Sequence, residues 1–386
     1  MPVGRPASTL RFMADLTIAN TVSDLILGDI QEHLPLERIP LQGDVLGLGT
    51  TTSVDNGELT FLRDGGQNTA IWRCVAHDGS IRKLEVGDAS SHFPYVCFTR
   101  DATELRRPVD LEQLGIQENL PLQELVAKAI AQGRGDGSLE DAPLYGVRLT
   151  AQWHELVITV ASKLCMGQQR RNVEIASSAS SSATAGQSIY DMLQHYRLAA
   201  MPPQSDNDPI RYLGRSMQWD CCGFFDTQPT LGRVTVPQVG AHLHLHGCST
   251  DLAYGGHLHH EHGSTRLQRL EHLVLYPLQS IQSLVSDLAI ESLCYEDGEI
   301  HFRVGNLGDM DVNDIGVAVV LNDRFSTHRY LRIPWMKAKD HEDFSLPWDL
   351  PSGRHQISVV VDPEQVVLEP EALHQNNRRD LVVEIP

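Results

Sequence analysis

Three histidines at alternate positions, His242, His244 and His246, are the residues of this sequence best suited to chemistry. Because successive side chains of a β-strand point to opposite faces, all three imidazoles would project from one face, with the apolar residues between them on the other. Neutral imidazole is a favoured ligand of zinc and of its neighbours in the first transition series. The spacing therefore predicts a metal-binding face on a strand.

The chain is expected to return to this strand a few residues later. The segment from Gly247 to Gly256 is rich in small and turn-forming residues, and His257 follows directly. A return strand would bring His257 beside the earlier histidines, and a catalytic zinc site has about three protein ligands and an open position. Since seven of the 18 histidines lie between residues 242 and 262, the alternative is a surface tract that binds metal loosely.

The composition limits the class of protein and its partners. A length of 386 residues is enough for two or three domains, and 41% hydrophobic with 21% charged residues is typical of a globular protein. The 50 acidic against 31 basic residues give a net charge of -19, which repels nucleic acid and anionic membranes. The seven cysteines are scattered, which indicates a reducing compartment. The sequence also shows no apolar leader and no apolar run long enough to span a membrane, so a cytoplasmic location is expected.

The elements that must position the histidines are mostly short strands. Asn56-Gly57 separates two apolar runs and predicts a β-hairpin, with Glu58 directly after its turn. Strands are also expected at residues 144–150 and 156–161, with Arg148 in the first. Taken alone, Glu58 and Arg148 would each be read as a solvated charge on a strand.

Two further segments are neither strand nor hairpin. Pro121 begins a run in which apolar residues recur on one face, so a helix is expected there. Residues 176–188 consist largely of serine and alanine, a low-complexity composition that predicts a flexible surface loop.

The pattern changes near the C-terminus. From Ile300 onward, short alternating runs are separated by Gly, Pro, Asn and Asp, which is typical of a small antiparallel β-sandwich. We place the domain boundary near residue 293, which gives domains of residues 1–292 and 293–386. No catalytic or metal-binding cluster is visible in the sandwich, so it is expected to make protein or dimer contacts, or simply to stabilise the chain.

Residues from about 10 to 290 resemble the acetolactate decarboxylase family, through blocks that follow the family's order. The blocks include Gly47-Leu48-Gly49-Thr50, Asp55-Asn56-Gly57-Glu58, Phe93-Pro94-Tyr95-Val96, Tyr145-Gly146-Val147-Arg148, Cys222-Gly223-Phe224-Phe225, His242-Leu243-His244 and Gly255-Gly256-His257. Residues 293–386 resemble the CARDB type of bacterial adhesion module, which is immunoglobulin-like. The similar blocks there include Val304-Gly305-Asn306-Leu307-Gly308-Asp309, Leu350-Pro351-Ser352-Gly353 and Asn376-Asn377.

The resemblance implies an α+β (mixed α/β) catalytic unit with two β-sheets and a metal between them, usually in a homodimer. It implies that His242, His244 and His257 bind zinc, with Glu58 and Arg148 in the active site. The family's further pocket glutamate has two candidates, and three other residues near the site have no assigned role. These are Glu291 and Glu296, and then His246, His259 and Cys248.

The implied activity is the zinc-dependent decarboxylation of 2-acetolactate to acetoin and carbon dioxide. Zinc would act as a Lewis acid that stabilises the enediolate, Arg148 would pair with the substrate carboxylate, and Glu58 would deliver a proton. One alternative is a same-fold metal-dependent decarboxylase or lyase for another 2-hydroxy-3-oxo or β-keto acid, suggested by the polar residues 259–262. The other is a non-catalytic, metal-containing binding protein, which would need neither Glu58 nor Arg148.

Overall fold

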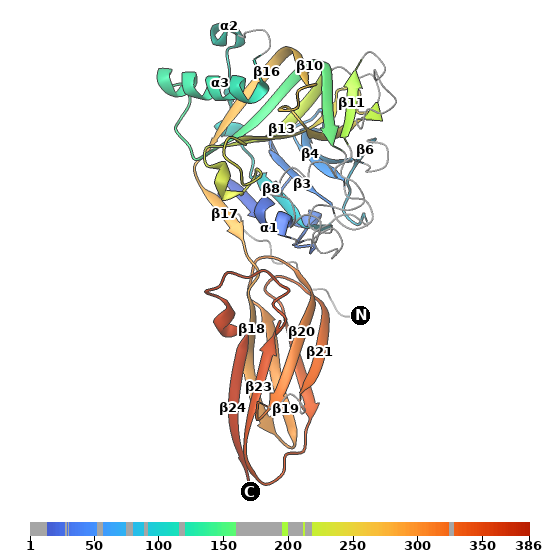
Figure 1. Cartoon of the computed structure of the whole chain (residues 1–386), viewed down its shortest axis with the longest axis vertical. Helices are drawn as coiled ribbons and strands as arrows, with labels where there is room; N and C mark the ends of the chain where they lie inside the picture. Colours follow the sequence, from blue (N-terminus) through green and yellow to red (C-terminus); the bar gives the residue numbers. More distant parts are fainter. Residues whose placement is uncertain are drawn as a thin grey trace. The chain divides into compact units, whose positions relative to one another are not determined.

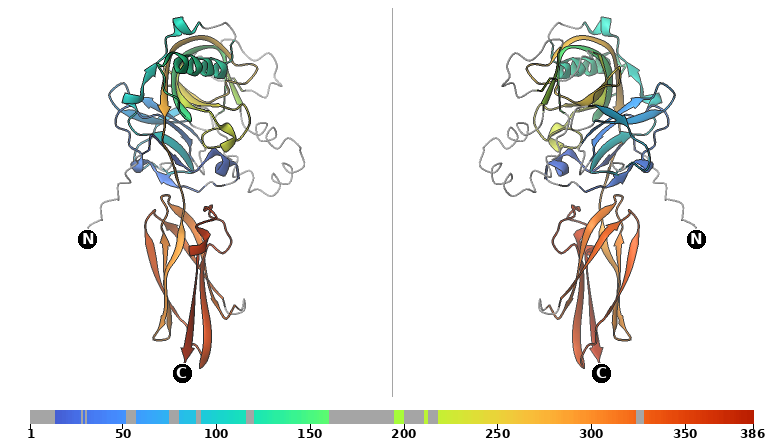
Figure 2. Two further views of the ribbon diagram at one scale, coloured as in Figure 1. Left: turned by 90° about the vertical axis from the view of Figure 1, so that its left-hand side faces the viewer. Right: turned by 90° about the vertical axis from the view of Figure 1, so that its right-hand side faces the viewer.

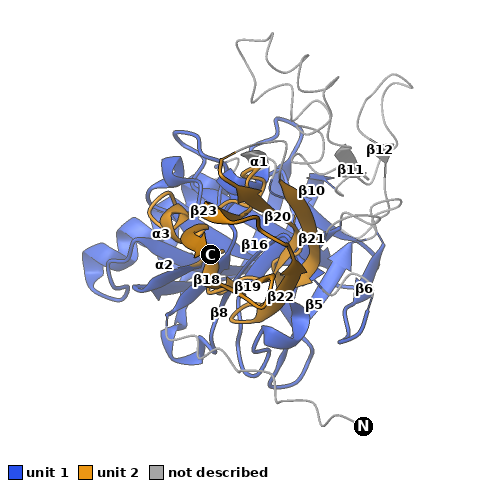
Figure 3. Ribbon diagram, turned by 90° about the horizontal axis from the view of Figure 1, so that it is seen from below, with its two compact units in different colours: residues 1–30, 35–283 blue, residues 31–34, 284–386 orange. Residues whose placement is uncertain are grey.

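The computed structural model describes most of the chain, and it divides into two compact units. The described residues are 14–27, 29, 31–51, 57–74, 80–88, 92–115, 120–159, 195–199, 211–212, 218–323 and 328–386. One unit comprises residues 1–30 and 35–283, and the other comprises residues 31–34 and 284–386 (Figure 3). The predicted loop at residues 176–188 lies outside the described residues. No helix in the described part of the chain is long and apolar enough to cross a membrane.

Two β-sheets form the first unit (Figure 1). The smaller has the strand order β17-β1-β8-β3-β4-β5-β6. Its strands are β1 (Leu16–Ala19), β3 (Gly47–Thr50), β4 (Glu58–Arg63), β5 (Thr69–Cys74), β6 (Ile81–Lys83), β8 (Tyr95–Thr99) and β17 (Ile281–Leu284). The antiparallel pairing of β3 with β4 confirms the hairpin expected from Asn56-Gly57, although the turn itself lies outside the described residues.

The second sheet is built on one long strand, β10 (Leu144–Thr159). Sequence patterns predicted two strands here, but alternation of buried and more exposed side chains continues between them, so the strand is unbroken. The sheet order is β12-β11-β10-β13-β14-β15, with β16 paired to β10 and β9 paired to β16. These strands are β9 (Arg107–Pro108), β11 (His195–Ala199), β12 (Arg211–Tyr212), β13 (Gln218–Asp226), β14 (Leu243–Ser249), β15 (Gly255–Leu258) and β16 (Arg266–Leu278).

Helix α3 (Leu122–Asp136) covers one face of this second sheet (Figure 2). Leu125, Val126 and Ile130 lie on its buried side and pack with the apolar side chains of β10, β13 and β16. The helix follows Pro121 as predicted, and it ends at Gly137, whose φ of 78° is readily adopted by glycine. The sheet's other face is therefore left to meet the smaller sheet.

Short elements complete the first unit. They are α1 (Val22–Leu27), α2 (Leu111–Leu114), β7 (His92–Phe93) and the 3-10 turns at Leu36–Arg38, Thr103–Leu105 and Pro229–Leu231. Strand β2 (Leu34–Pro35) includes the residue at which the division between the two units falls. Strands thus dominate the described part of the unit, and the expectation of an α+β architecture is met only in part.

The second unit is a β-sandwich, as predicted. One sheet has the order β18-β19-β22 and the other β21-β20-β23-β24, with an apolar core that includes Phe302, Val317 and Val359. The strands are β18 (Leu288–Glu296), β19 (Glu299–Asn306), β20 (Val312–Leu321), β21 (Arg329–Met336), β22 (His341–Pro347), β23 (Gly353–Val361) and β24 (Arg378–Ile385), with a 3-10 turn at His374–Asn376. The longer segment of this unit begins at Leu284 rather than near residue 293, because β18 pairs with β19.

A buried ion pair joins the two sheets of the first unit. The Nε of Arg148, on β10, donates to Oδ1 of Asp44 at 2.9 Å, and the side chains are 13% and 2% exposed. Two more guanidinium N–H groups donate to the main-chain oxygens of Val45 and Phe61 in the opposite layer. The hydroxyl of Tyr276 donates to the other oxygen of Asp44 at 2.8 Å. Removal of Asp44 would thus leave a buried cation without its counter-charge.

We expect Asp44→Ala to reduce the free energy of unfolding by about 3–5 kcal/mol, the usual effect of breaking a buried pair. The matched control is Asp141→Ala, which removes the exposed ion pair between Asp141 and Arg134 at 3.0 Å and should cost less than about 1 kcal/mol. Urea unfolding of the two variants measures the difference. Equal losses in both variants would contradict a structural role for the buried pair.

Candidate metal centre

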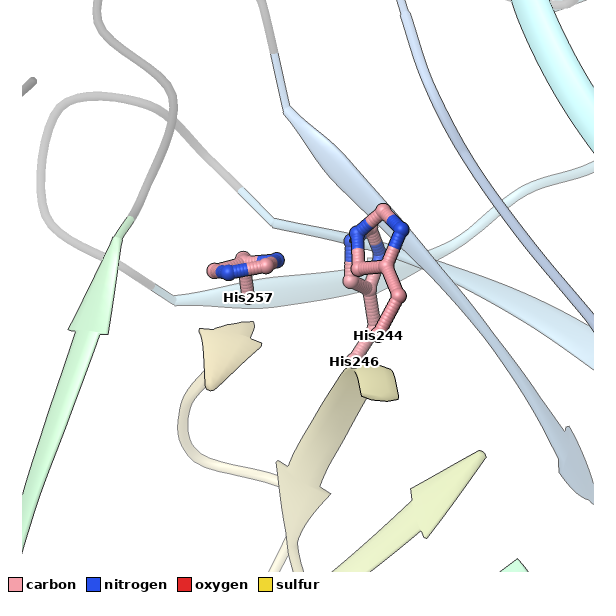
Figure 4. Close-up of side chains that lie close together, drawn as sticks. All are labelled: His244, His246 and His257. Carbon is pink, nitrogen blue, oxygen red and sulfur yellow. The ribbon is translucent and has the colours of Figure 1, made fainter. Parts of the chain in front are cut away.

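Three histidines converge on the face of the second sheet that meets the smaller sheet. His244 and His246 occupy alternate positions of β14, and His257 lies on β15, directly opposite His246 in the antiparallel register. One ring nitrogen from each residue lies within 4.8 Å of the others. Figure 4 shows the ring of His257 turned toward the pair formed by His244 and His246. The hairpin therefore assembles a three-imidazole cluster.

Main-chain carbonyls fix two of these rings. Nδ1 of His244 bonds to the oxygen of Val234, and Nδ1 of His246 bonds to the oxygen of Leu59 at 2.8 Å. A carbonyl oxygen can only accept, so each Nδ1 must carry the hydrogen. In a neutral ring the Nε2 atom is then an unprotonated acceptor.

Burial keeps the rings neutral. It lowers the pKa of His244 to about 4. The pKa values of His246 and His257 are also lowered, first by burial and then by the charges of the neighbouring histidines. Neutral imidazole is the form that binds a transition metal.

The two Nε2 atoms of His244 and His246 lie 3.1 Å apart. Two lone pairs that face each other at this distance repel, and a cation between them removes the repulsion. Two nitrogens bound to one tetrahedral zinc at about 2.0–2.1 Å lie roughly 3.3 Å apart. The donor set and its spacing therefore fit a zinc-like ion held by His244, His246 and His257.

His242 does not join this cluster, so the predicted ligand set of His242, His244 and His257 is not the one that the structure brings together. His242 precedes the first residue of β14, its Nδ1 bonds to the oxygen of Asp226 at 2.7 Å, and its ring stacks on Phe225 with centroids 5.3 Å apart. Side chains alternate between the two faces only within a strand, and β14 begins after His242. The face shared by His244 and His246 therefore does not extend to His242.

His246, which the family resemblance had left out, takes the place of His242. The hairpin geometry could have identified it. A turn around Asp251 and Leu252 pairs Cys248 with Gly255 and therefore places His257 opposite His246. The sequence shows turn-forming residues at 249–251. An antiparallel hairpin with its turn at these residues pairs His257 with His246 and not with His242.

Glu58 lies beside the cluster. It is the first residue of β4, and its Oε2 lies 3.5 Å from Nε2 of His246. Its side chain is only 17% exposed. Burial raises the pKa of Glu58 to about 8, so near neutral pH the carboxyl group retains its proton. An acid is therefore available next to the three imidazoles.

Arg148 shares the face of the histidines but lies further away. Arg148 on β10 lies opposite Cys222 on β13, and Cys222 lies opposite His246 on β14. The backbones of Arg148 and His246 are therefore two inter-strand spacings apart, or roughly 10 Å. Arg148 lines a cavity of about 530 Å³ whose lining includes none of the three histidines. Three of its five N–H groups bind Asp44, Val45 and Phe61, so two have no partner among the residues that the structure describes.

The other candidates do not enter the cluster. Cys248 is buried on β14, and burial raises the pKa of its thiol to about 12, which disfavours the thiolate that metals bind. Both ring nitrogens of His259 already contact protein groups. Glu291 and Glu296 are exposed residues of β18 in the second unit. Neither glutamate belongs to the first unit that holds the histidines.

Comparisons with known proteins yield one family match and several similar structures. Residues 286–380 match the family model described as CARDB, which confirms the prediction for the C-terminal unit. No curated protein matches the chain. A solved CARDB domain from Pyrococcus furiosus is 22% identical and covers 26% of this chain and 94% of its own, with a TM-score of 0.21.

Two solved acetolactate decarboxylases are similar to the larger part of the chain. The enzyme from Bacillus subtilis strain 168 is 13% identical and covers 69% of this chain and 87% of its own, with a TM-score of 0.44. That from Bacillus subtilis subspecies spizizenii is 16% identical and covers 69% and 88%, with a TM-score of 0.41. The case for an activity therefore rests on the residues of the metal centre itself.

The raised pKa of Glu58 predicts a pH-dependent stability of the metal-free protein. Folding raises this pKa from 4.5 to about 8, so the native state favours the protonated carboxyl group. The associated stability is fully present below pH 4.5 and is lost as the pH rises through about 8. Glu58→Gln cannot ionise and should escape this loss.

We therefore expect the stability of chelator-treated Glu58→Gln to increase relative to that of the chelator-treated wild-type protein between pH 5 and pH 8. Urea unfolding at several pH values in this range measures the difference. A difference that stays constant with pH would show that the carboxyl group is not buried in this way.

Proposed function

We propose that the first unit is a metal-dependent decarboxylase of the acetolactate decarboxylase kind, acting on a 2-hydroxy-3-oxo acid such as 2-acetolactate. The observation that carries this proposal is the convergence of three neutral imidazoles beside the buried carboxyl group of Glu58. The sequence blocks around Glu58, Arg148 and His257 resemble those of acetolactate decarboxylases, and they supply the reaction class.

His244, His246 and His257 would hold zinc. Once bound, zinc would supply a positive charge that stabilises negative charge developing on the oxygens of the substrate. The three histidines contribute no charge of their own, because burial keeps the pKa of each ring low. They therefore leave the charge of the ion undiminished.

Glu58 would act as the general acid. When carbon dioxide leaves 2-acetolactate, the bond between the carboxyl carbon and C2 breaks and its electron pair stays with the remaining fragment. A proton added at C2 then gives acetoin. Glu58 lies 3.5 Å from His246, and in the metal-free protein burial raises its pKa to about 8, so the carboxyl group holds a proton near neutral pH before the metal binds. Its fixed place on one strand would deliver the proton to one face of the substrate.

Arg148 has two tasks in this proposal. Its bonds to Asp44, Val45 and Phe61 hold together the sheets that carry the histidines and Glu58. Its two remaining N–H groups would orient the substrate carboxylate, for which a planar guanidinium is well suited. Both tasks depend on the guanidinium fork, so Lys at this position would not replace it.

A second candidate is a related decarboxylase for a different 2-hydroxy-3-oxo acid. Polar residues 259–262 follow the third histidine, where members of the resembled family continue with apolar residues. A non-catalytic metal-binding protein is less well supported, since it gives no reason to bury Glu58 beside the ligands. Assays with several 2-hydroxy-3-oxo acids would separate the first two candidates.

The test of the proposed function compares two histidines from the same tract. The purified protein is loaded with zinc, incubated with racemic 2-acetolactate, and assayed for acetoin, carbon dioxide and bound metal. We expect turnover that a chelator abolishes, and His244→Ala should lose both metal and activity by at least about 100-fold. His242→Ala should retain both, because His242 lies outside the cluster.

Three outcomes would count against these assignments. Zinc-loaded wild-type protein that yields neither product would refute decarboxylation of 2-acetolactate. Loss of metal in both His242→Ala and His244→Ala would instead support the ligand set predicted from the sequence, and full metal content in His244→Ala would contradict a ligand role for His244.

A further inference from the structure

The third histidine of the cluster is held differently from the other two. Nδ1 of His244 and of His246 each bonds to a main-chain oxygen. Among the residues that the structure describes, no such bond is found for either ring nitrogen of His257, which instead contacts three other imidazoles. Its ring centroid lies 4.9 Å from that of His244, 5.4 Å from that of His246 and 4.7 Å from that of His259.

His259 is itself firmly fixed. It is only 2% exposed, and its ring meets that of His257 at an interplanar angle of 67°. Its Nε2 bonds to the hydroxyl of Thr159, which lies opposite His257 in the register of β10 and β15. Its Nδ1 bonds to Oε1 of Glu261 at 2.8 Å. Because both ring nitrogens of His259 bond to other side chains, His259 packs against His257 and does not serve as a metal ligand.

The backbone around His259 is also fixed. Its N–H donates to the oxygen of Val157 at 2.9 Å, and its own oxygen accepts from the hydroxyl of Thr265. The next residue, His260, bonds through Nε2 to the oxygen of Leu243 at 2.9 Å. The turn after β15 is thereby tied both to β10 and to the start of β14, the strand that carries His244.

Glu261 is the part of this arrangement closest to solvent, since its side chain is 53% exposed. Burial opposes its ionisation, but the hydrogen bond from His259 and the charges of His259 and His260 together lower its pKa to about 2. Glu261 is therefore a carboxylate that accepts a hydrogen bond from His259.

We propose that Thr159, His259 and Glu261 are positioning residues that hold the ring of His257 in its metal-binding orientation. This inference rests on the metal centre of the proposed function. His257, for which no carbonyl partner is found among the described residues, instead packs against the ring of His259, and two hydrogen bonds hold that ring in place. Groups that orient metal-ligating histidines typically alter metal affinity by about 10–100-fold when they are removed.

The test measures metal binding, not turnover. Cobalt chloride is titrated into chelator-treated protein, and the visible absorption of bound cobalt(II) reports both affinity and ligand geometry. His259→Ala and Glu261→Ala should each weaken cobalt binding by about 10–100-fold and alter the absorption bands. Glu261→Gln keeps an oxygen that can accept from His259, so it should restore most of the affinity. His154→Ala, at an exposed position of β10, is the matched control and should bind as the wild type does.

The outcomes separate the two proposals. Wild-type protein that binds no cobalt would overturn the metal centre itself. Wild-type binding with unchanged affinity and spectrum in the alanine variants would overturn only the positioning role. If His259→Ala fails to fold, as judged by circular dichroism, the pair of Glu261 variants decides the question, because Glu261 is half exposed. Equal weakening in Glu261→Ala and Glu261→Gln would contradict a role for the hydrogen bond between Glu261 and His259.

Discussion

The metal centre of the first unit depends on the close approach of two unprotonated nitrogens, Nε2 of His244 and Nε2 of His246, which lie 3.1 Å apart. They are held there because a carbonyl from the loop before β14 binds the ring of His244 and a carbonyl from β4 binds the ring of His246. The second of these bonds crosses from one sheet to the other. The cluster therefore exists only while the two sheets keep their spacing, and the spacing depends on what lies between them.

Near the site, polar contacts fix that spacing together with buried apolar side chains such as Phe61 and Phe224. Arg148 reaches from β10 to Asp44 and to two carbonyls of the opposite layer, while the apolar side chains of β10 pack on the other face against α3. Buried ion pairs cost free energy through desolvation and often stabilise less than an apolar contact would. Their advantage here is geometric, because a guanidinium with three fixed acceptors defines one position, whereas apolar side chains can slide past each other.

Local patterns in the sequence predicted the elements well. Turn residues or a periodic pattern over a few positions predicted three parts of the fold. These are the hairpin around Asn56-Gly57, the helix after Pro121 and the C-terminal sandwich. The choice between His242 and His246 depends on where β14 begins and on the hairpin register, which the alternation of histidines alone does not define. The pairing of Arg148 with Asp44 joins residues 104 positions apart, so no local signal reveals it. The homodimer and the cytoplasmic location stay predictions.

The charges of the centre imply an order of binding. His244, His246, His257 and Glu58 are all neutral near pH 7, because burial displaces each pKa toward the uncharged form. The nearby cation, Arg148, is offset by Asp44. An anionic substrate therefore meets no net positive charge in a chain whose overall charge is -19. Under the proposed function, a divalent ion at the histidines would supply the attraction that the protein lacks, so the metal would bind before the proposed carboxylate substrate.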